Sequence, residues 1–451
     1  MIAERQLSGR LESGAVEDHF PSIPHELLMA VKGLWESPVS DPFRLHEGEE
    51  FRNLVKICAK LYPKAAGANG GVPDDGTRWA LLNLFEITGA PWTESHAPSP
   101  EDVATKIASA MKMSEVEIVH LCPLDRANAW PAMRFGPCEI RLLGTDELDG
   151  LVQPARLRRH HPDWGFDTKQ FAAFQWLVVR EIVPVSFPVG SRTQFKILYK
   201  RWDEIPPGIV PHKSGIPKIV ETALFALILL PWEQMTTRDR WRGFRIPWIY
   251  SVSSDPFAPP APPPDPESLS WKEIDPGDPD WPERPDVYYP LGPHAKDQFA
   301  ILDEKRWRDI SNALQAPLFN ELVAHFMVRA FLSDGIDEFL GHMTAIEAAL
   351  TLPRDHDVKG RPKLAGINPG ATERVARRIT AITTDTCKGC EFKRLYKLRS
   401  DYLHGKSVGL IPYDDLSAVR ALARDVADRL AAEAVAAPSL CREQFLEGLC
   451  P

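Results

Sequence analysis

The sequence predicts an α+β multidomain protein, in which a mixed α/β N-terminal region is followed by an all-α helical bundle at the C-terminus. Apolar residues recur at helical spacings in the first 114 residues, and short β-branched bursts bounded by Pro and Gly follow them. Helical patterns return after a proline-rich stretch, and a chain of 451 residues is too long for one ordinary core. The predicted organisation is a helical region 1–114, a β-containing domain 115–254, a linker 255–295, a helical bundle 296–436 and a tail 437–451.

The N-terminal region shows mostly helical signals after a first stretch, residues 1–20, that lacks periodicity and is expected to be a mobile arm. Ser99 and Pro100, followed by two acidic residues, form a typical helix start. We expect helices at residues 26–35, 49–61, 78–87 and 100–113.

The character of the sequence changes after residue 114, where runs such as EIVHLCPL favour strands. Residues 219–230 fit a buried helix or a buried strand, and we favour the helix. Residues 255–290 are crowded with proline, which favours an extended spacer over a ligand for a proline-reading partner domain. Strands are expected at residues 117–124, 138–144, 174–183 and 195–199.

The last third of the chain carries one helical pattern after another, and the short connections imply an antiparallel bundle. In residues 371–383, Arg374, Arg377 and Arg378 are expected to face outward or toward a ligand, because the apolar positions lie on another side. The expected helices are residues 303–313, 317–332, 336–352, 371–383, 391–404 and 413–434.

The charge of the chain restricts where nucleic acid could bind. A net charge of -9 argues against a protein that coats nucleic acid over its whole surface. Residues 371–409, however, hold nine Lys and Arg against four Asp and Glu, so any such site should be local. No apolar run approaches the ~20 residues that span a bilayer, so we expect a soluble, cytoplasmic protein without a membrane partner.

One stretch, FKRLYKLRSDYLHGK at residues 392–406, has the residues for chemistry at its end. It fits an amphipathic helix in which Gly405 supports the left-handed conformation that ends many helices. Arg399 and His404 lie roughly 140° apart around such a helix, but a long Arg side chain and a His in the last turn can converge beyond its end. A His there can exchange protons near neutral pH.

The bundle resembles the Apea-like HEPN domain family in three segments: AIEAAL at 345–350, RVARRI at 374–379 and LYKLRSDYLHG at 395–405. The resemblance covers roughly the final third of the chain. It implies a helical bundle that pairs as a homodimer, so that two Arg-x4-6-His motifs meet. It also implies a metal-independent endoribonuclease without a cofactor, acting on RNA, with transfer RNA as one candidate, in anti-phage defence or toxin-like growth arrest.

The resemblance assigns catalysis to Arg399 and His404. The alternative is a catalytically silent HEPN module that dimerises and binds RNA, nucleotide or protein, and Ser400 favours it because the family often has Asn, Asp or His after the Arg. Glu347 is expected to orient a basic residue of a neighbouring helix, or to form a buried ion pair with Arg374 or Arg378. The supporting residues are Ser400, Asp401, Glu347 and Tyr402, and the RNA-binding candidates are Arg374, Arg377, Arg378, Arg394, Lys397 and Lys406.

Two further motifs have mainly structural interpretations. Arg156 and His161 also have the Arg-x4-His spacing, but within a polar stretch expected to be a loop, where an RNA contact is the alternative to simple solvation. Seven Cys do not indicate a disulfide framework, and we expect free thiols and no metal. A zinc site is the alternative, built from Cys387, Cys390, Cys441 and Cys450.

Overall fold

The computed structural model describes residues 23–36, 48–67, 76–88, 98–127, 130–163, 166–192, 215–231, 244–263, 269–272, 284–285, 291–293, 295–357, 368–406 and 409–450. The expected arm 1–20, the strand candidate 195–199 and most of the proline-rich stretch lie outside these residues. The chain divides into two compact units, and the border between residues 114 and 115 is also a border between the units.

The first unit contains the N-terminal helices, together with residues 185–192 and 255–259. All four predicted helices are confirmed. Ser99 caps the last of them by accepting a hydrogen bond from the backbone N–H of Asp102 at 3.0 Å. The elements of this unit are α1 (His25–Glu36), α2 (Glu49–Leu61), α3 (Gly76–Thr88), α4 (Pro100–Lys112) and the 3₁₀ helix η2 (Val189–Arg192).

The second unit joins the β-containing region to the C-terminal helices. Its main sheet has five strands in the order β2-β3-β4-β1-β5, and each named pair is antiparallel. The predicted strands at 117–124, 138–144 and 174–183 are confirmed, while β2 and β5 are additional. The strands are β1 (Glu115–Leu124), β2 (Met133–Phe135), β3 (Cys138–Leu142), β4 (Gln175–Pro184) and β5 (Tyr250–Ser253), and a small second sheet pairs β6 (Trp271–Lys272) with β7 (Arg284–Pro285).

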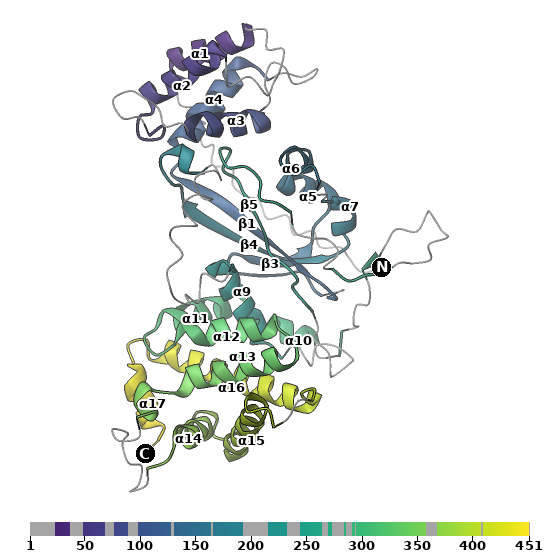
Figure 1. Ribbon diagram of the computed structural model, residues 1–451, viewed down its shortest axis with the longest axis vertical. Helices are drawn as coiled ribbons and strands as arrows, with labels where there is room; N and C mark the ends of the chain where they lie inside the picture. Colours follow the sequence, from purple (N-terminus) through teal and green to yellow (C-terminus); the bar gives the residue numbers. More distant parts are fainter. Residues whose placement is uncertain are drawn as a thin grey trace, which may run out of the picture. The chain divides into compact units, whose positions relative to one another are not determined.

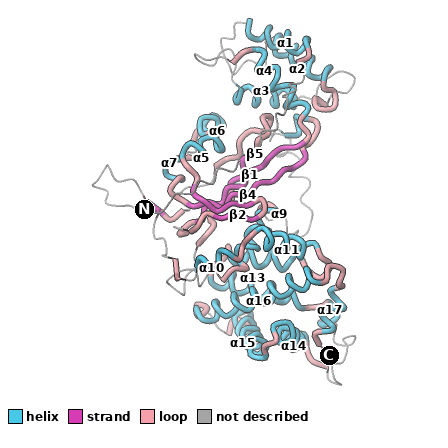
Figure 2. The backbone as a smooth tube through the Cα atoms, turned by 180° about the vertical axis from the view of Figure 1, so that it is seen from behind, coloured by secondary structure: helices cyan, strands magenta, loops and turns pink. Residues whose placement is uncertain are grey.

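Both faces of the main sheet are covered, which explains why residues 121–124 of β1 and 176–179 of β4 are apolar on both faces. Alternate residues point to opposite faces, so Leu121 and Val178 pack on one side while Cys122 and Leu177 pack on the other. The helices α5 (Thr145–Val152), α6 (Pro154–His160) and α7 (Thr168–Phe171) cover the first face. The helix α9 (Lys218–Ile228), predicted as a helix, and the bundle cover the second (Figures 1 and 2).

The C-terminal helices share one hydrophobic core with the second face of the sheet, so regions 115–254 and 296–436 belong to one unit. All six helices expected there are present. A further helix precedes them, and the expected tail contains another, whose Leu446 is fully buried. The helices are α10 (Ala295–Ala300), α11 (Glu304–Gln315), α12 (Glu321–Phe331), α13 (Gly335–Leu350), α14 (Ala371–Thr383), α15 (Thr386–Leu403), α16 (Tyr413–Ala436) and α17 (Arg442–Gly448).

Helix α15 carries the predicted catalytic pair, and both of its ends have clear causes. Asp385 caps the start by accepting a hydrogen bond from the Cys387 N–H at 2.8 Å. The helix therefore begins at Thr386, five residues before the predicted start. At the other end Gly405 has φ 67°, as its sequence position predicts. The Gly405 N–H bonds the Tyr402 carbonyl at 3.1 Å, and the Lys406 N–H bonds that of Asp401 at 2.8 Å. This Schellman motif fixes the chain directly after His404.

Helices α14 and α15 approach each other closely at Gly389, which is buried. A Cβ atom there would lie 2.3 Å from the Thr380 Oγ1 and 2.7 Å from the Ala376 carbonyl oxygen. Only a glycine therefore fits at this contact, which sets the position of α15 in the bundle. No helix in the described ranges is long and apolar enough to cross a membrane.

Candidate active site at the end of α15

Arg399 lies in the last turns of α15, and its side chain is held from two directions. Its Nη2 is 3.6 Å from the Oε2 of Glu347 on α13, and the two side chains are each about one-quarter exposed, at 25% and 27%. Its guanidinium carbon lies 5.5 Å from the ring centroid of Tyr396, one helical turn earlier. The ion pair and the cation–π contact restrict the guanidinium group without using most of its hydrogen-bond donors.

The Nε of Arg399 is buried and has no hydrogen-bond partner among the described residues. The distance to Glu347 is also longer than an ordinary charge-assisted hydrogen bond. Because an unpaired buried donor costs roughly 1–3 kcal/mol, such groups are uncommon in folded proteins and are often found at functional sites. Because this Nε is covered by protein, an anionic ligand would have to bind through the terminal nitrogens of the one-quarter-exposed side chain.

His404 is the residue at which α15 ends, and its side chain is exposed. Its backbone N–H donates to the Ser400 carbonyl at 3.0 Å, so the backbone is ordered while the imidazole is accessible. A helix rises 1.5 Å per residue, so Arg399 and His404 start about 7–8 Å apart along the axis.

The three predicted supporting residues of α15 have mainly structural contacts. Asp401 pairs with Lys406 at 3.6 Å, and Ser400 supplies the carbonyl that caps His404. The Tyr402 hydroxyl donates to the Leu410 carbonyl at 3.1 Å, which attaches Leu410 to the helix. These contacts shape the end of α15 around His404.

Glu347 pairs with Arg399, not with Arg374 or Arg378. Burial raises the pKa of its carboxyl, and the positive charges of Arg399 and His356 only partly oppose this effect. A carboxyl whose pKa is raised on folding destabilises the fold progressively as the pH rises through that pKa. The Glu347 carboxyl should therefore lower the free energy of unfolding more at pH 7 than at pH 4.

Glu347→Gln should raise the melting temperature relative to the parent by a larger margin at pH 7 than at pH 4, because glutamine cannot ionise. Thermal unfolding of both proteins at the two pH values measures this. Glu433→Gln, at an exposed position of α16, is the matched control. Its melting temperature should differ from that of the parent by the same amount at both pH values. An equal margin for Glu347→Gln at both pH values would contradict a raised pKa.

The prediction that Arg374 and Arg378 face outward to bind RNA is wrong. Their exposed fractions are 2% and 1%, and both lie beside Asp355, which is 1% exposed. Arg378 donates to both carboxylate oxygens of Asp355, to the Leu350 carbonyl at 2.7 Å and to the Leu446 carbonyl at 3.0 Å. The Arg374 Nε is 3.9 Å from the same carboxylate. These two arginines hold the inside of the bundle together.

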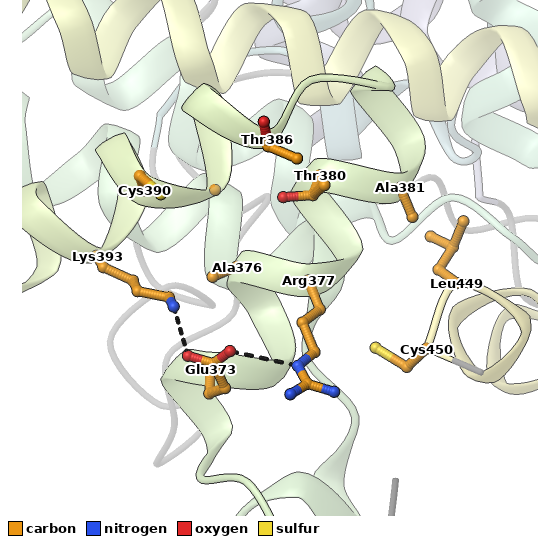
Figure 3. Close-up of a pocket in the computed structure, with 11 residues that line it drawn as sticks. Glu373, Ala376, Arg377, Thr380, Ala381, Thr386, Cys390, Lys393, Leu449 and Cys450 are labelled. Carbon is orange, nitrogen blue, oxygen red and sulfur yellow. Dashed lines mark hydrogen bonds and ion pairs between the residues drawn. The ribbon is translucent and has the colours of Figure 1, made fainter. Parts of the chain in front are cut away.

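The other RNA-binding candidates are more accessible. Arg394 pairs with Glu391 and Asp415, which offsets its charge, and Lys406 pairs with Asp401 but is 69% exposed. Lys397 is exposed and has no ion-pair partner in the described ranges. Arg377 pairs with Glu373 at 3.3 Å on the side of α14 that faces a pocket (Figure 3).

The second Arg-x4-His segment was predicted to be a loop, and this is wrong. Residues Pro154–His160 form α6, with Pro154 in its first turn, and Arg156 is buried. The Nε2–H of His161 donates a hydrogen bond to the Pro260 carbonyl at 3.2 Å. This segment packs against the sheet, so its spacing alone does not indicate a site.

The cysteines of the chain are all free. Cys387, Cys390 and Cys441 are exposed, and Cys450 is buried with its Sγ 3.7 Å from the Arg374 carbonyl oxygen. Within the described ranges no group of three or more His, Cys, Asp or Glu side chains is arranged to hold a metal ion.

Sequence reasoning missed two contributors to this region. Tyr396 is not among the predicted site residues, although its spacing of three from Arg399 is a signal for a cation–π contact. His356, on the turn after α13, was missed because it comes 43 residues before Arg399 in a stretch without periodicity. No protein-family model matches the chain, and the searches of curated proteins and solved structures also found no match.

Proposed function

We propose that the C-terminal bundle is a metal-independent endoribonuclease of the HEPN type, which cleaves RNA with Arg399 and His404 in anti-phage defence or toxin-like growth arrest. The observation that carries this proposal is Arg399. Its guanidinium is held by Glu347 and Tyr396 while its buried Nε has no partner in the described part of the chain. A phosphate group could accept hydrogen bonds from the terminal nitrogens of this partly exposed side chain.

The chemistry needs a base, an acid and a stabiliser for the phosphoryl oxygens. The ribose 2′-OH attacks the adjacent phosphorus after losing its proton to His404, and the 5′-oxygen leaves after gaining a proton. The products are a 2′,3′-cyclic phosphate and a 5′-hydroxyl end. Arg399 donates hydrogen bonds to the phosphoryl oxygens, whose negative charge increases in the transition state.

The surface beside His404 supports a homodimer. Leu403 and Leu410, on either side of it in the sequence, are 55% and 96% exposed, and the Tyr402 hydroxyl restrains Leu410 by donating to its carbonyl. Exposed apolar side chains beside a charged site are typical of interfaces. A two-fold dimer through this surface would bring two copies of His404 together, one able to act as base and the other as acid.

The proposal predicts a specific product. Total RNA incubated with the purified protein in EDTA should be cut and should carry 2′,3′-cyclic phosphate or 3′-phosphate ends, because no metal takes part in the reaction. RNA in which every 2′-OH is methylated should resist, since it lacks the nucleophile. Chemical typing of the ends measures this outcome. Ends with a 3′-hydroxyl, or strict dependence on Mg²⁺, would indicate a different mechanism. Binding of RNA without any cleavage would favour the silent module.

A further inference from the structure

A pocket of about 440 Å³ opens between α14, α15 and the residues that follow α17. Figure 3 shows Arg377 and Glu373 on one wall, Cys390 and Lys393 on a second wall, and Leu449 and Cys450 on a third. The volume lies within the range of pockets that hold small molecules in proteins. The proposed cleavage by Arg399 and His404 does not use this pocket.

The pocket has one positive charge in excess. Glu373 accepts the Nε of Arg377 at 3.3 Å and pairs with the Nζ of Lys393 at 2.6 Å. One carboxylate cannot neutralise two cations. Arg377 engages Glu373 through Nε alone, and its two terminal nitrogens have no hydrogen-bond partner among the described residues. A planar group with two acceptor oxygens would fit this pair of donors.

The walls of the pocket are fixed by packing. Gly389 and Ala376 form the close contact between α14 and α15, so the base of the pocket has little room to rearrange. The third wall is anchored by the hydrogen bond from the Arg378 Nε to the Leu446 carbonyl, and by Cys450 against the Arg374 carbonyl. The pocket is therefore formed before any ligand arrives, which lowers the entropic cost of binding.

We propose that this pocket binds a small organic carboxylate with a compact apolar body, whose carboxylate pairs with Arg377 and Lys393. A monoanion balances the single excess charge, whereas a phosphate dianion would exceed it. The pocket is separate from the proposed active site, because Lys393 and His404 are eleven residues apart on one helix, or about 16 Å along its axis. The proposal does not depend on ribonuclease activity.

Cys390 lines the pocket and is exposed, so its thiol can report on occupancy. Cys387 is exposed on the same helix but is not part of the lining, and it is the matched control thiol. The variants Cys387→Ser/Cys441→Ser and Cys390→Ser/Cys441→Ser each leave one exposed thiol, since the remaining cysteines are buried. The rate of reaction with the neutral disulfide 2,2′-dithiodipyridine is followed by release of thiopyridone, with benzoate as the probe carboxylate.

Benzoate should slow the reaction of Cys390 by a factor of 1 + [benzoate]/Kd, about tenfold at roughly ten times Kd, and should leave Cys387 unaffected. Benzyl alcohol, which lacks the charge, should protect neither thiol. In the Cys387→Ser/Cys441→Ser protein, whose exposed thiol is Cys390, adding Arg377→Gln should abolish protection by benzoate. Adding Arg394→Gln, which lies outside the lining, should leave the protection unchanged. Circular dichroism confirms that each variant is folded. Absent protection of Cys390, equal protection of both thiols, or protection that persists in Arg377→Gln would overturn the proposal.

Discussion

Asp355→Asn should destabilise the C-terminal bundle by about 3–5 kcal/mol, because it removes the buried carboxylate that pairs with the buried Arg374 and Arg378. Total stabilities of 5–15 kcal/mol are usual, so the variant should show a large fall in its denaturation midpoint or fail to fold. The carboxylate also accepts the Leu352 N–H at 2.8 Å, which connects the end of α13 to the cluster. Urea denaturation followed by circular dichroism measures the effect.

The pH dependence of this effect has a definite sign. Burial alone would raise the pKa of Asp355, but the hydrogen bonds from Arg378 and Leu352 and the charges of Arg378 and Arg374 outweigh it, so the pKa is lowered. The stability that Asp355 contributes is complete above its unfolded pKa of about 3.9 and is lost as the pH falls through the folded pKa. The difference in unfolding free energy between the parent and Asp355→Asn should therefore become smaller below about pH 4. Asp337→Asn, at an exposed position, is the control and should cost less than about 1 kcal/mol.

The second large effect concerns the activity proposed above, in which Arg399 binds the phosphoryl oxygens and His404 transfers protons. Arg399→Ala should lower the rate of RNA cleavage by about 10²–10³, because it removes donors to the charged phosphoryl oxygens. His404→Ala should lower it by about 10²–10⁴, because it removes the group that transfers protons. Neither change should alter the unfolding free energy by more than about 1 kcal/mol, since His404 is exposed and Arg399 has only a partly exposed ion pair. Initial cleavage rates and melting temperatures measure the two quantities.

His161→Ala is the matched control for this pair, because the same Arg-x4-His spacing occurs at Arg156 and His161 on α6. It should leave the cleavage rate at the parental value. A loss of cleavage in His161→Ala equal to that in His404→Ala would contradict the assignment of the site to the end of α15.

The helices and central strands were predictable because their apolar residues recur with clear periods. The prediction for α14 is correct at both ends, and β1 and β4 follow from runs of β-branched residues. The first five residues of α15 were missed because the apolar pattern starts only at Phe392, while the helix begins at the Asp385 cap. Helix α6 was also missed, although Pro154 in its first turn was a usable signal.

The end of α15 was predictable from local sequence, since Gly405 and the helical pattern fix where His404 lies. The environment of the arginines was not. A buried arginine paired with a carboxylate and a surface arginine that faces RNA have the same appearance in the sequence. Asp355, the residue that decides between them for Arg378, comes 23 residues earlier and reaches it through a turn after α13. Glu347 reaches Arg399 from another helix, and only the packing of the bundle selects that partner.

The most direct test of the Arg399 and His404 site compares the parent protein and His404→Ala, purified in the same way, on total RNA in EDTA. The proposed mechanism predicts that the parent cuts RNA, leaving cyclic phosphate or 3′-phosphate ends, and that His404→Ala is at least about 10²-fold slower while melting at nearly the same temperature. If His404→Ala cuts RNA at the parental rate, the bundle is not an Arg/His ribonuclease.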